Sequence, residues 1–388
     1  MPSLISRFSR YTVGLLAVNV LSVTYLTLAP AIVGAFIEQL HIRPDQAGVI
    51  TSAQLAGSAV GVGLVLFGFC RASETTLLRL STIVMAACDL CCALLSQPWS
   101  IVICRAVAGT AAGVAFAVVN AAAGRFPRPA RMYASLLTAQ MAFGIAGYLG
   151  LPALLGAAGL RGVFMALGLL ACFCLSLIGR APFEDRLPVL EDGTLRADFP
   201  STTYTFLTSL TILYVSNSAV WTYLDRIGVT AGLSGARVDI ALAWSMGAGL
   251  AGAVLASVCA TRIRPTTAVL AGVLVMAACT AALSASHIAL LYTVAVAGFN
   301  GSLMYVVPFY FARLAIGAKA HRNVSAASMA IFVGLAAGPF LASYVVTNEH
   351  YDRLVPIATV GLVIAAALVM VPLAFRRTER HAIRAADS

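Results

Sequence analysis

Residues 99–131 read WSIVICRAVAGTAAGVAFAVVNAAAGRFPRPAR, an apolar run with one charged side chain, Arg105, followed by a short gap that carries three arginines. A helix that crosses a bilayer needs about 20 mostly apolar residues, and the 99–124 run reaches that length. The whole chain repeats this alternation of apolar run and short gap. With 10% charged residues and a mean hydropathy of +0.92, the composition excludes an ordinary soluble domain, in which about 25% of residues are charged.

Twelve runs of this kind follow one another along the sequence. They are continuously apolar, which is typical of membrane helices and not of the alternating strands of a barrel. The stretch 265–312 is too long for one helix, so we divide it at residues 284–287. The sequence therefore predicts an all-α polytopic membrane protein with twelve transmembrane helices, at 11–37, 46–70, 80–96, 99–124, 132–157, 162–179, 200–224, 240–261, 266–284, 288–312, 323–347 and 354–375.

Arginine and lysine lie mainly in every second gap between these runs. If the N-terminus is cytoplasmic, 19 of the 25 cationic residues fall on the cytoplasmic side, as the positive-inside rule requires. We therefore expect both termini to be cytoplasmic and the first run to be a retained anchor, in an integral protein of a bacterial inner membrane. The net charge of +10 reflects this threading. No soluble basic patch is visible, so we expect no nucleic-acid partner.

The two halves of the chain resemble each other at an offset of roughly 190 residues. Gly57 corresponds to Gly247, and Gly109 corresponds to Gly298. Such a repeat predicts two pseudo-symmetric six-helix bundles, an arrangement in which transporters place a site between the halves. We expect the first bundle at 1–179, a cytoplasmic linker at 180–199, and the second bundle with a short cytoplasmic tail at 200–388.

Twelve spans as six plus six, cytoplasmic ends and a polar central connector resemble the major facilitator superfamily over essentially the whole chain. Segment 105–113 (RAVAGTAAG) resembles that superfamily's arginine-plus-glycine motif in the fourth helix. Segment 334–339 (GLAAGP) is similar to its antiporter motif of helix 5, here in the repeat-equivalent helix. The resemblance implies the superfamily's fold and transport by alternating access. We assign gating and helix packing to Pro30, Gly109, Gly113, Gly144, Gly147, Gly334, Gly338 and Pro339.

Asp89 and Arg105 are two charges inside predicted spans. On insertion scales each costs about 2.5–3.5 kcal/mol at mid-helix. Both lie on the order of 8–10 Å inside the same membrane boundary, at 1.5 Å per residue, so they could form an ion pair. In one interpretation Asp89 takes up and releases a proton while Arg105 tunes its proton affinity. In the others, the pair is static, or Arg105 contacts an anionic substrate.

Polar and aromatic side chains inside the spans indicate where a substrate could bind. Tyr214, Asn217 and Trp221 share one helical face, which favours cavity lining, with interhelical packing as the alternative. Asp225 continues this face and is expected at the water interface. The residues that we assign to substrate binding are Asn19, Tyr25, Gln54, Arg105, Asn120, Gln140, Tyr214, Asn217, Trp221, Asn300 and Met304.

The nine cysteines all lie within spans or at their ends. Cys88, Cys91, Cys92 and Cys104 could together bind a soft metal such as Cu(I). Packing as small apolar residues is the favoured interpretation, so we assign no metal site and no cofactor.

These observations predict a secondary active transporter and not an enzyme. We expect it to move a small organic solute, neutral or anionic and partly aromatic or apolar, by alternating access coupled to protons, with a lean towards efflux. Uptake of an organic anion or nutrient, proton-coupled or facilitative, is the alternative. A copper transporter and a polytopic membrane enzyme are less favoured. The sequence has no phosphate-binding loop that would use ATP. We expect a monomer whose partners are its small-molecule substrate, protons and lipid.

Overall fold

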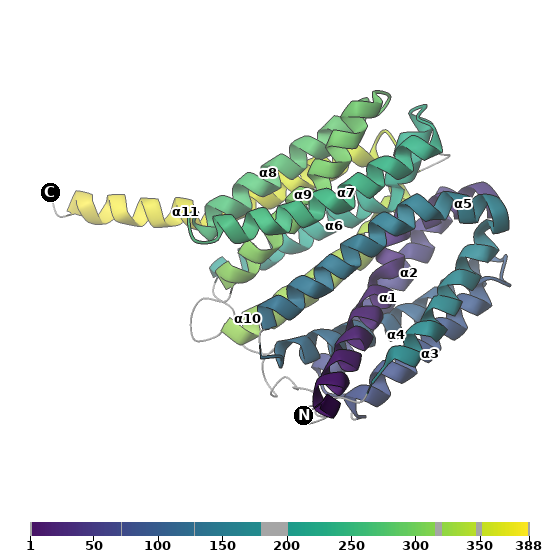
Figure 1. The fold of residues 1–388 in the computed structure, drawn as a ribbon. Coiled ribbons are helices and arrows are strands. Elements are labelled where there is room, and N and C mark those ends of the chain that lie inside the picture. The colour runs from purple at the N-terminus through teal and green to yellow at the C-terminus, as the bar shows by residue number, and fades with distance from the viewer. Residues whose placement is uncertain are drawn as a thin grey trace.

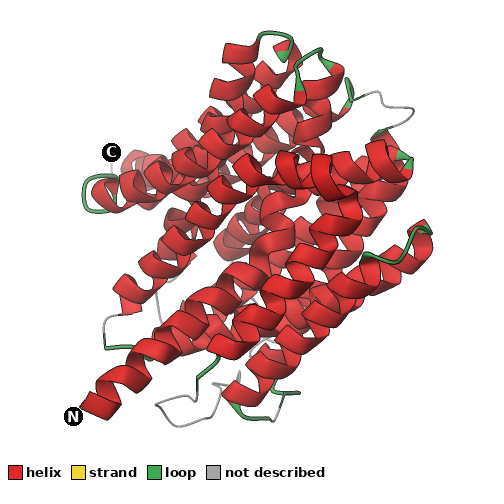
Figure 2. Cartoon of the chain, turned by 45° about the vertical axis from the view of Figure 1, so that its right-hand side comes forward, coloured by secondary structure: helices red, strands yellow, loops and turns green. Residues whose placement is uncertain are grey.

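The computed structural model describes residues 2–70, 72–127, 129–179, 201–314, 320–346 and 351–386. The linker predicted at 180–199 lies outside the described residues. Within the described part the chain is helical, with short connections and no strands (Figure 2). Its helices are α1 (Pro2–Leu40), α2 (Pro44–Leu66), α3 (Glu74–Cys92), α4 (Pro98–Gly124), α5 (Pro129–Leu177), α6 (Ser201–Thr230), α7 (Gly235–Cys259), α8 (Pro265–Ala282), η1 (Leu283–Ala285), α9 (Ala289–Leu314), α10 (Ala320–Val345) and α11 (Leu354–Ala386).

Helix α5 holds two of the predicted spans, 132–157 and 162–179. It is broken at Gly159, whose φ of 64° and ψ of −170° are not helical, and glycine adopts a positive φ without a steric penalty. The backbone N–H of Leu160 donates a 2.6 Å hydrogen bond to the side chain of Gln39, which holds this corner against α1. Figure 1 shows α5 running to one end of the molecule and turning back. The break at Gly159 therefore separates the fifth span from the sixth.

Nine helices in the described part are long and apolar enough to cross a membrane, with α5 counted once. Helix α6 does not meet that criterion, and the apolar part of α11 is the shorter stretch Leu354–Met370. Proline stands in the first turn of α2, α4 and α8, where the missing N–H leaves no hydrogen bond unmade. The prediction of an all-helical polytopic membrane fold is confirmed.

The helices pack in two sets that repeat the same pairs. In the first set α2 and α3 both pack on α4, and α5 packs on α1 and on α3. In the second set α7 packs on α9, α8 on α9, and α6 on α10 and α11. We call α1–α5 the first bundle and α6–α11 the second bundle (Figure 1). The exact domain boundaries 1–179, 180–199 and 200–388 stay a prediction.

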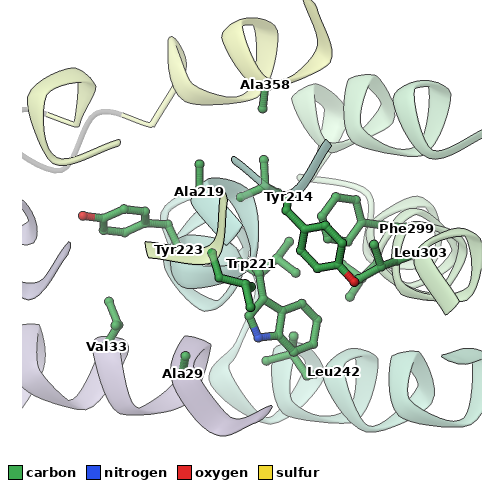
Figure 3. Packing of buried hydrophobic residues seen from close by; sticks show 14 of the residues in the cluster. Ala29, Val33, Tyr214, Ala219, Trp221, Tyr223, Leu242, Phe299, Leu303 and Ala358 are labelled. Carbon is green, nitrogen blue, oxygen red and sulfur yellow. The ribbon is translucent and has the colours of Figure 1, made fainter. Parts of the chain in front are cut away.

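The most extensive contacts between the bundles are made by α2 with α10, α5 with α7, and α1 with α6. We call this contact the seam. The connections 41–43 and 231–234 lie at the end of the bundles opposite to the start of α1. We call this end the far end. One apolar core crosses the seam and includes Leu28 and Val33 of α1 with Val220 and Leu224 of α6. Figure 3 shows Ala29 and Val33 facing the α6 side chains there.

A second apolar core lies in the half of the first bundle nearer to the start of α1. It includes Leu15 and Val18 of α1 with Val118 of α4, and no described residue of the second bundle belongs to it. The first bundle is therefore joined to the second by apolar packing towards the far end, whereas its other half has a core of its own. In this conformation the far end is closed.

Helices α2 and α4 approach each other most closely through glycines. A Cβ placed on Gly109 or Gly113 of α4 would overlap the backbone of α2 at Gln54 or Ser58. A Cβ on Gly57 of α2 would in turn overlap the α4 backbone at Ala106. Small residues allow such close approach between membrane helices. The motif glycines of α4 therefore lie where the backbones of α2 and α4 approach each other most closely.

The other predicted packing residues lie at helix contacts as well. Gly144 faces the side chain of Met246 across the seam, and Gly147 faces Leu28. Gly334 and Gly338 lie against the backbone of α6. The last two, Pro30 and Pro339, lie inside helices α1 and α10. Their role in gating remains a prediction.

Candidate functional site

Asp89 on α3 and Arg105 on α4 form an ion pair inside the first bundle. The Nη2 of Arg105 lies 2.6 Å from Oδ1 of Asp89, and the arginine side chain is 2% exposed. The guanidinium also lies over two aromatic rings, with its central carbon 5.5 Å from the centre of Tyr25 and 5.1 Å from the centre of Phe164. Ring faces attract cations, more strongly where water is excluded. The structure therefore brings the two predicted charges together. It also places the rings of Tyr25 and Phe164 on Arg105, and we call these two rings the aromatic clamp.

A narrow cavity lies beside this pair. The space that the centre of a water molecule can reach is about 20 Å³, and one water needs roughly 10–15 Å³ on that measure. The cavity thus has room for one or two waters and none for a drug-sized solute. Its lining residues all come from the first bundle: Leu21, Ser22, Thr24, Tyr25, Gln54, Met85, Asp89, Arg105, Ala108, Ala112 and Leu167.

Two polar atoms of the cavity lining have no hydrogen-bond partner among the described residues. They are Nε of Arg105, which can only donate, and Oε1 of Gln54, which can only accept. Both residues are nearly fully buried, at 2% and 4% exposure. Buried polar groups of this kind are normally satisfied, often by an ordered water. A water can accept a hydrogen bond from an atom such as Nε and donate one to an atom such as Oε1.

Two other predicted polar residues of the first bundle, Asn19 and Asn120, make hydrogen bonds within that bundle. Nδ2 of Asn19 donates to the carbonyl of Leu136 at 3.3 Å, which links α1 to α5. Nδ2 of Asn120 donates to the carbonyl of Phe116 in its own helix. Gln140 is half-buried. Among the predicted binding residues of this bundle, the structure places Tyr25, Gln54 and Arg105 at the cavity.

The predicted face on α6 lies elsewhere. Tyr214, Asn217 and Trp221 are buried, and none of them lines the cavity of the first bundle. Nε1 of Trp221 donates a 2.8 Å hydrogen bond to the carbonyl of Leu26 on α1, so this ring bridges the seam. Figure 3 shows the indole among the seam residues, with Tyr214 turned towards Phe299. The α6 face therefore contributes to contact between the bundles.

Asn217 has a further feature, because its Oδ1 atom is buried and has no hydrogen-bond partner among the described residues.

The two predicted residues on α9 differ from each other. Nδ2 of Asn300 donates to the carbonyl of Ser245 at 2.8 Å, which ties α9 to α7. Met304 is half-buried and would touch a side chain added at Gly249. Their roles in binding stay predictions.

Polar contacts at the far end of the seam were not predicted from the sequence. The hydroxyl of Tyr223 donates to the carbonyl of Pro44 at 2.8 Å. The hydroxyl of Ser52 on α2 donates to the carbonyl of Ala336 on α10 at 2.6 Å. These contacts join α2 to the second bundle. Tyrosine and serine are common inside membrane helices, so no signal in the sequence distinguishes these two.

The expectation for Asp225 is wrong. The residue was expected at the water interface, but it is 9% exposed. Its carboxylate lies against Gly34 of α1, where an added Cβ would overlap it. The neighbouring Arg226 forms an ion pair with Glu38 of α1 across the seam. The sequence pair Asp225-Arg226 suggested a solvated turn, whereas α6 continues to Thr230 and buries both residues in the seam.

The cysteines of α3 and α4 lie near the ion pair without forming a metal centre. The thiol of Cys104 donates to the carbonyl of Cys88 at 3.2 Å. Within the described ranges, no group of three or more histidine, cysteine, aspartate or glutamate side chains has a geometry that could hold a metal ion. The nine cysteines are free thiols.

Comparison with known proteins gives a result for the fold and not for the sequence. No protein-family model and no curated protein matches the sequence. Among solved structures, a point mutant of the nucleoside transporter NupG matches with a TM-score of 0.74 over 93% of this chain and 99% of that chain, at 9% identity. The nucleoside transporter NupG itself matches with a TM-score of 0.72 over 93% and 98%, at 9% identity. The chain therefore has the polytopic helical fold of these two solved structures.

Proposed function

We propose that this chain is a secondary active transporter, and not an enzyme, that moves a small organic solute across the membrane by alternating access. The observation that carries the proposal is the buried Asp89–Arg105 pair beside a water-sized cavity, in a fold of two bundles joined by a seam. Ionisable residues inside a membrane bundle commonly mark ion or proton pathways. We further propose that protons drive the transport through Asp89.

The chemistry of the pair supports a proton role. Asp89 in its ionised form balances the guanidinium of Arg105, which has no second carboxylate within ion-pair distance among the described residues. When a proton reaches Asp89, the charge of Arg105 becomes uncompensated in a low-dielectric site. Asp89 lines the water-sized cavity, so a water there would be the direct proton donor to the carboxylate. Protonation would therefore change the stability of the packing around α3 and α4.

The aromatic clamp favours Arg105 as a fixed partner of Asp89. Its guanidinium already contacts Asp89, Tyr25 and Phe164. Its Nε is buried without a hydrogen-bond partner among the described residues, and the cavity beside it admits only water-sized molecules. We therefore place the solute in the space between the bundles when the seam rearranges, with Gln54, Gln140, Asn217 and Met304 among its contacts.

We propose a solute that is neutral or anionic and partly aromatic or apolar. Nucleosides enter the test panel first because the two solved neighbours are nucleoside transporters, and because a nucleoside is neutral and has an aromatic base. Aromatic carboxylates enter second. We keep efflux as the favoured direction and uptake as the alternative. Cytoplasmic termini, a bacterial inner membrane and a monomer are parts of the same proposal.

The test is solute flux into proteoliposomes with and without a pH gradient of either sign. We expect the wild-type protein to accumulate a panel member only when a gradient is present. Asp89→Asn should abolish gradient-driven accumulation while solute exchange without a gradient continues. The matched control is Asp352→Asn, which neutralises an exposed carboxylate. Unchanged gradient-driven accumulation by Asp89→Asn contradicts the coupling role.

A second variant guards against loss of folding. Asp89→Asn leaves Arg105 buried without its partner, which costs about 3–5 kcal/mol in other proteins. The double variant Asp89→Asn with Arg105→Gln removes both charges and avoids this penalty. If the double variant is monodisperse and still accumulates solute when a pH gradient is applied, neither charge couples transport to protons. If no panel solute moves in the wild type, the solute class is wrong.

A further inference from the structure

The far end of the seam contains a carboxylate with an unusual environment. Asp225 of α6 is 9% exposed and lies against the α1 backbone at Gly34. No described residue donates a hydrogen bond to its carboxylate. Its nearest cation, Nη1 of Arg226, is 3.9 Å away and is itself paired with Glu38. A buried carboxylate normally accepts hydrogen bonds or pairs closely with a cation. Asp225 does neither.

The surroundings of Asp225 add negative charge and offer no donor. Its electrostatic neighbours come from five helices: Arg226 on α6 itself, Glu38 on α1, Tyr148 on α5, Asp239 on α7 and Tyr292 on α9. The two phenols are already used, since Tyr148 donates to the carbonyl of Thr27 at 2.6 Å and Tyr292 donates to that of Leu224 at 2.8 Å. Three carboxylates thus share the one cation among these neighbours.

Because of this geometry, the stability of the closed seam depends on whether Asp225 is ionised or protonated. In the closed seam an ionised Asp225, whose side chain is 12% exposed, loses most of its water and gains little in exchange, so the closed seam is less stable with the anion. When the far end opens, the carboxylate would be hydrated and the penalty removed. A neutral carboxylic acid carries no such penalty. Proton binding and closure of the far end must therefore favour each other.

We propose that Asp225 is a proton-binding site on the seam, and that its proton holds the far end closed. Loss of the proton then favours opening of the far end. The inference rests on the alternating access of the proposed function, but it concerns a different carboxylate from Asp89 and a different pair of helices. Asp89 lies within one bundle, whereas Asp225 lies between the bundles, where a charge can act directly on the movement.

The chain contains a natural reporter for this seam. Trp221 stands one helical turn before Asp225, is 7% exposed and donates across the seam to α1. The remaining tryptophans, Trp99 and Trp244, are 69% and 66% exposed. Replacing both by phenylalanine leaves Trp221 as the single tryptophan. Its quenching by iodide then reports opening of the far end and requires no substrate, so the result is independent of the proposed solute.

The experiment measures iodide quenching of this single-tryptophan protein in lipid nanodiscs as a function of pH. We expect quenching to be weak at acidic pH and to increase as the pH rises, because a proton-linked equilibrium can shift by up to about tenfold per pH unit. Asp225→Asn mimics the protonated acid and should keep quenching weak at every pH. The control Asp352→Asn should titrate like the parent protein.

A second variant keeps the test decisive if Asp225→Asn does not fold. Glu38→Gln should free Arg226 to approach Asp225, which stabilises the anion in the closed seam and moves the rise in quenching to higher pH. The proposal is overturned if quenching of the parent protein does not depend on pH. It is also overturned if folded Asp225→Asn titrates like the parent, or if Glu38→Gln leaves the midpoint unchanged. The transport assay tests the proposed function, and the quenching titration tests the role of Asp225. Either experiment can fail while the other succeeds, so the two proposals are tested independently.

Discussion

Close packing of α2 on α4 should make Gly109 intolerant of even one methyl group. In Gly109→Ala the new Cβ would stand 2.8 Å from the carbonyl carbon of Gln54 and 3.1 Å from its Cα, and it would also overlap the carbonyl oxygen. Unbonded carbons pack at about 3.5–4.0 Å, so the helices must separate by at least about 0.7 Å (3.5 less 2.8). The obstacle is backbone, which cannot turn away as a side chain can.

The expected cost follows from two opposing effects. Overpacking of a well-packed contact costs about 1–3 kcal/mol, and a rigid backbone obstacle places Gly109→Ala at the upper end. Replacing glycine by alanine inside a helix recovers about 1 kcal/mol. We therefore expect a net loss of about 2 kcal/mol in the free energy of unfolding. The separation also moves Gln54 away from Arg105, so the polar lining of the cavity changes.

Gly150 offers the matched control. It also lies in a helix, α5, but nothing is within 4 Å of a Cβ placed there. Gly150→Ala should therefore gain stability, by up to about 1 kcal/mol. The assay is unfolding of purified protein in mixed micelles with increasing denaturing detergent, followed by tryptophan fluorescence. If Gly109→Ala is as stable as Gly150→Ala, the close approach of the two backbones does not exist.

Two further changes test the clamp and the seam. Phe164→Leu removes one ring from Arg105 and should destabilise the protein by up to about 2 kcal/mol in the same unfolding assay, and an unchanged unfolding midpoint would count against the clamp. Tyr223→Phe deletes the hydrogen bond to Pro44 at the far end, worth about 0.5–1.5 kcal/mol. It should raise iodide quenching of Trp221 at acidic pH, and equal quenching in the variant and its parent would show that this bond does not hold the seam closed.

The helices themselves could be predicted from the sequence because lipid removes alternatives. A backbone in hydrocarbon must satisfy its own hydrogen bonds, so each apolar run becomes a helix. The split of the long 265–312 stretch falls at η1 and the following turn, between α8 and α9. The corner between the fifth and sixth spans needed no loop, since the non-helical backbone at Gly159 turns the chain between the two helical parts of α5.

Part of the site was also predictable. Asp89 and Arg105 stand out because charges are rare inside spans, and their equal depth suggested the contact that the structure contains. The rings of Tyr25 and Phe164 could not be assigned to Arg105, because they come from helices remote in sequence. For the same reason the sequence did not identify the partner of Trp221, whose indole bridges the two bundles.

By itself the sequence determined that this protein lies in a bilayer, that its helices come in two related sets and that two charges sit inside the first set. Those properties depend on composition and on spacing along one chain, which local physics translates directly into helices. The tertiary structure alone decided that the cavity lies within one bundle and that Asp225 is buried at the seam without a donor. Burial is a property of which helices meet, and distant segments of the chain supply the partners that a carboxylate gains or lacks.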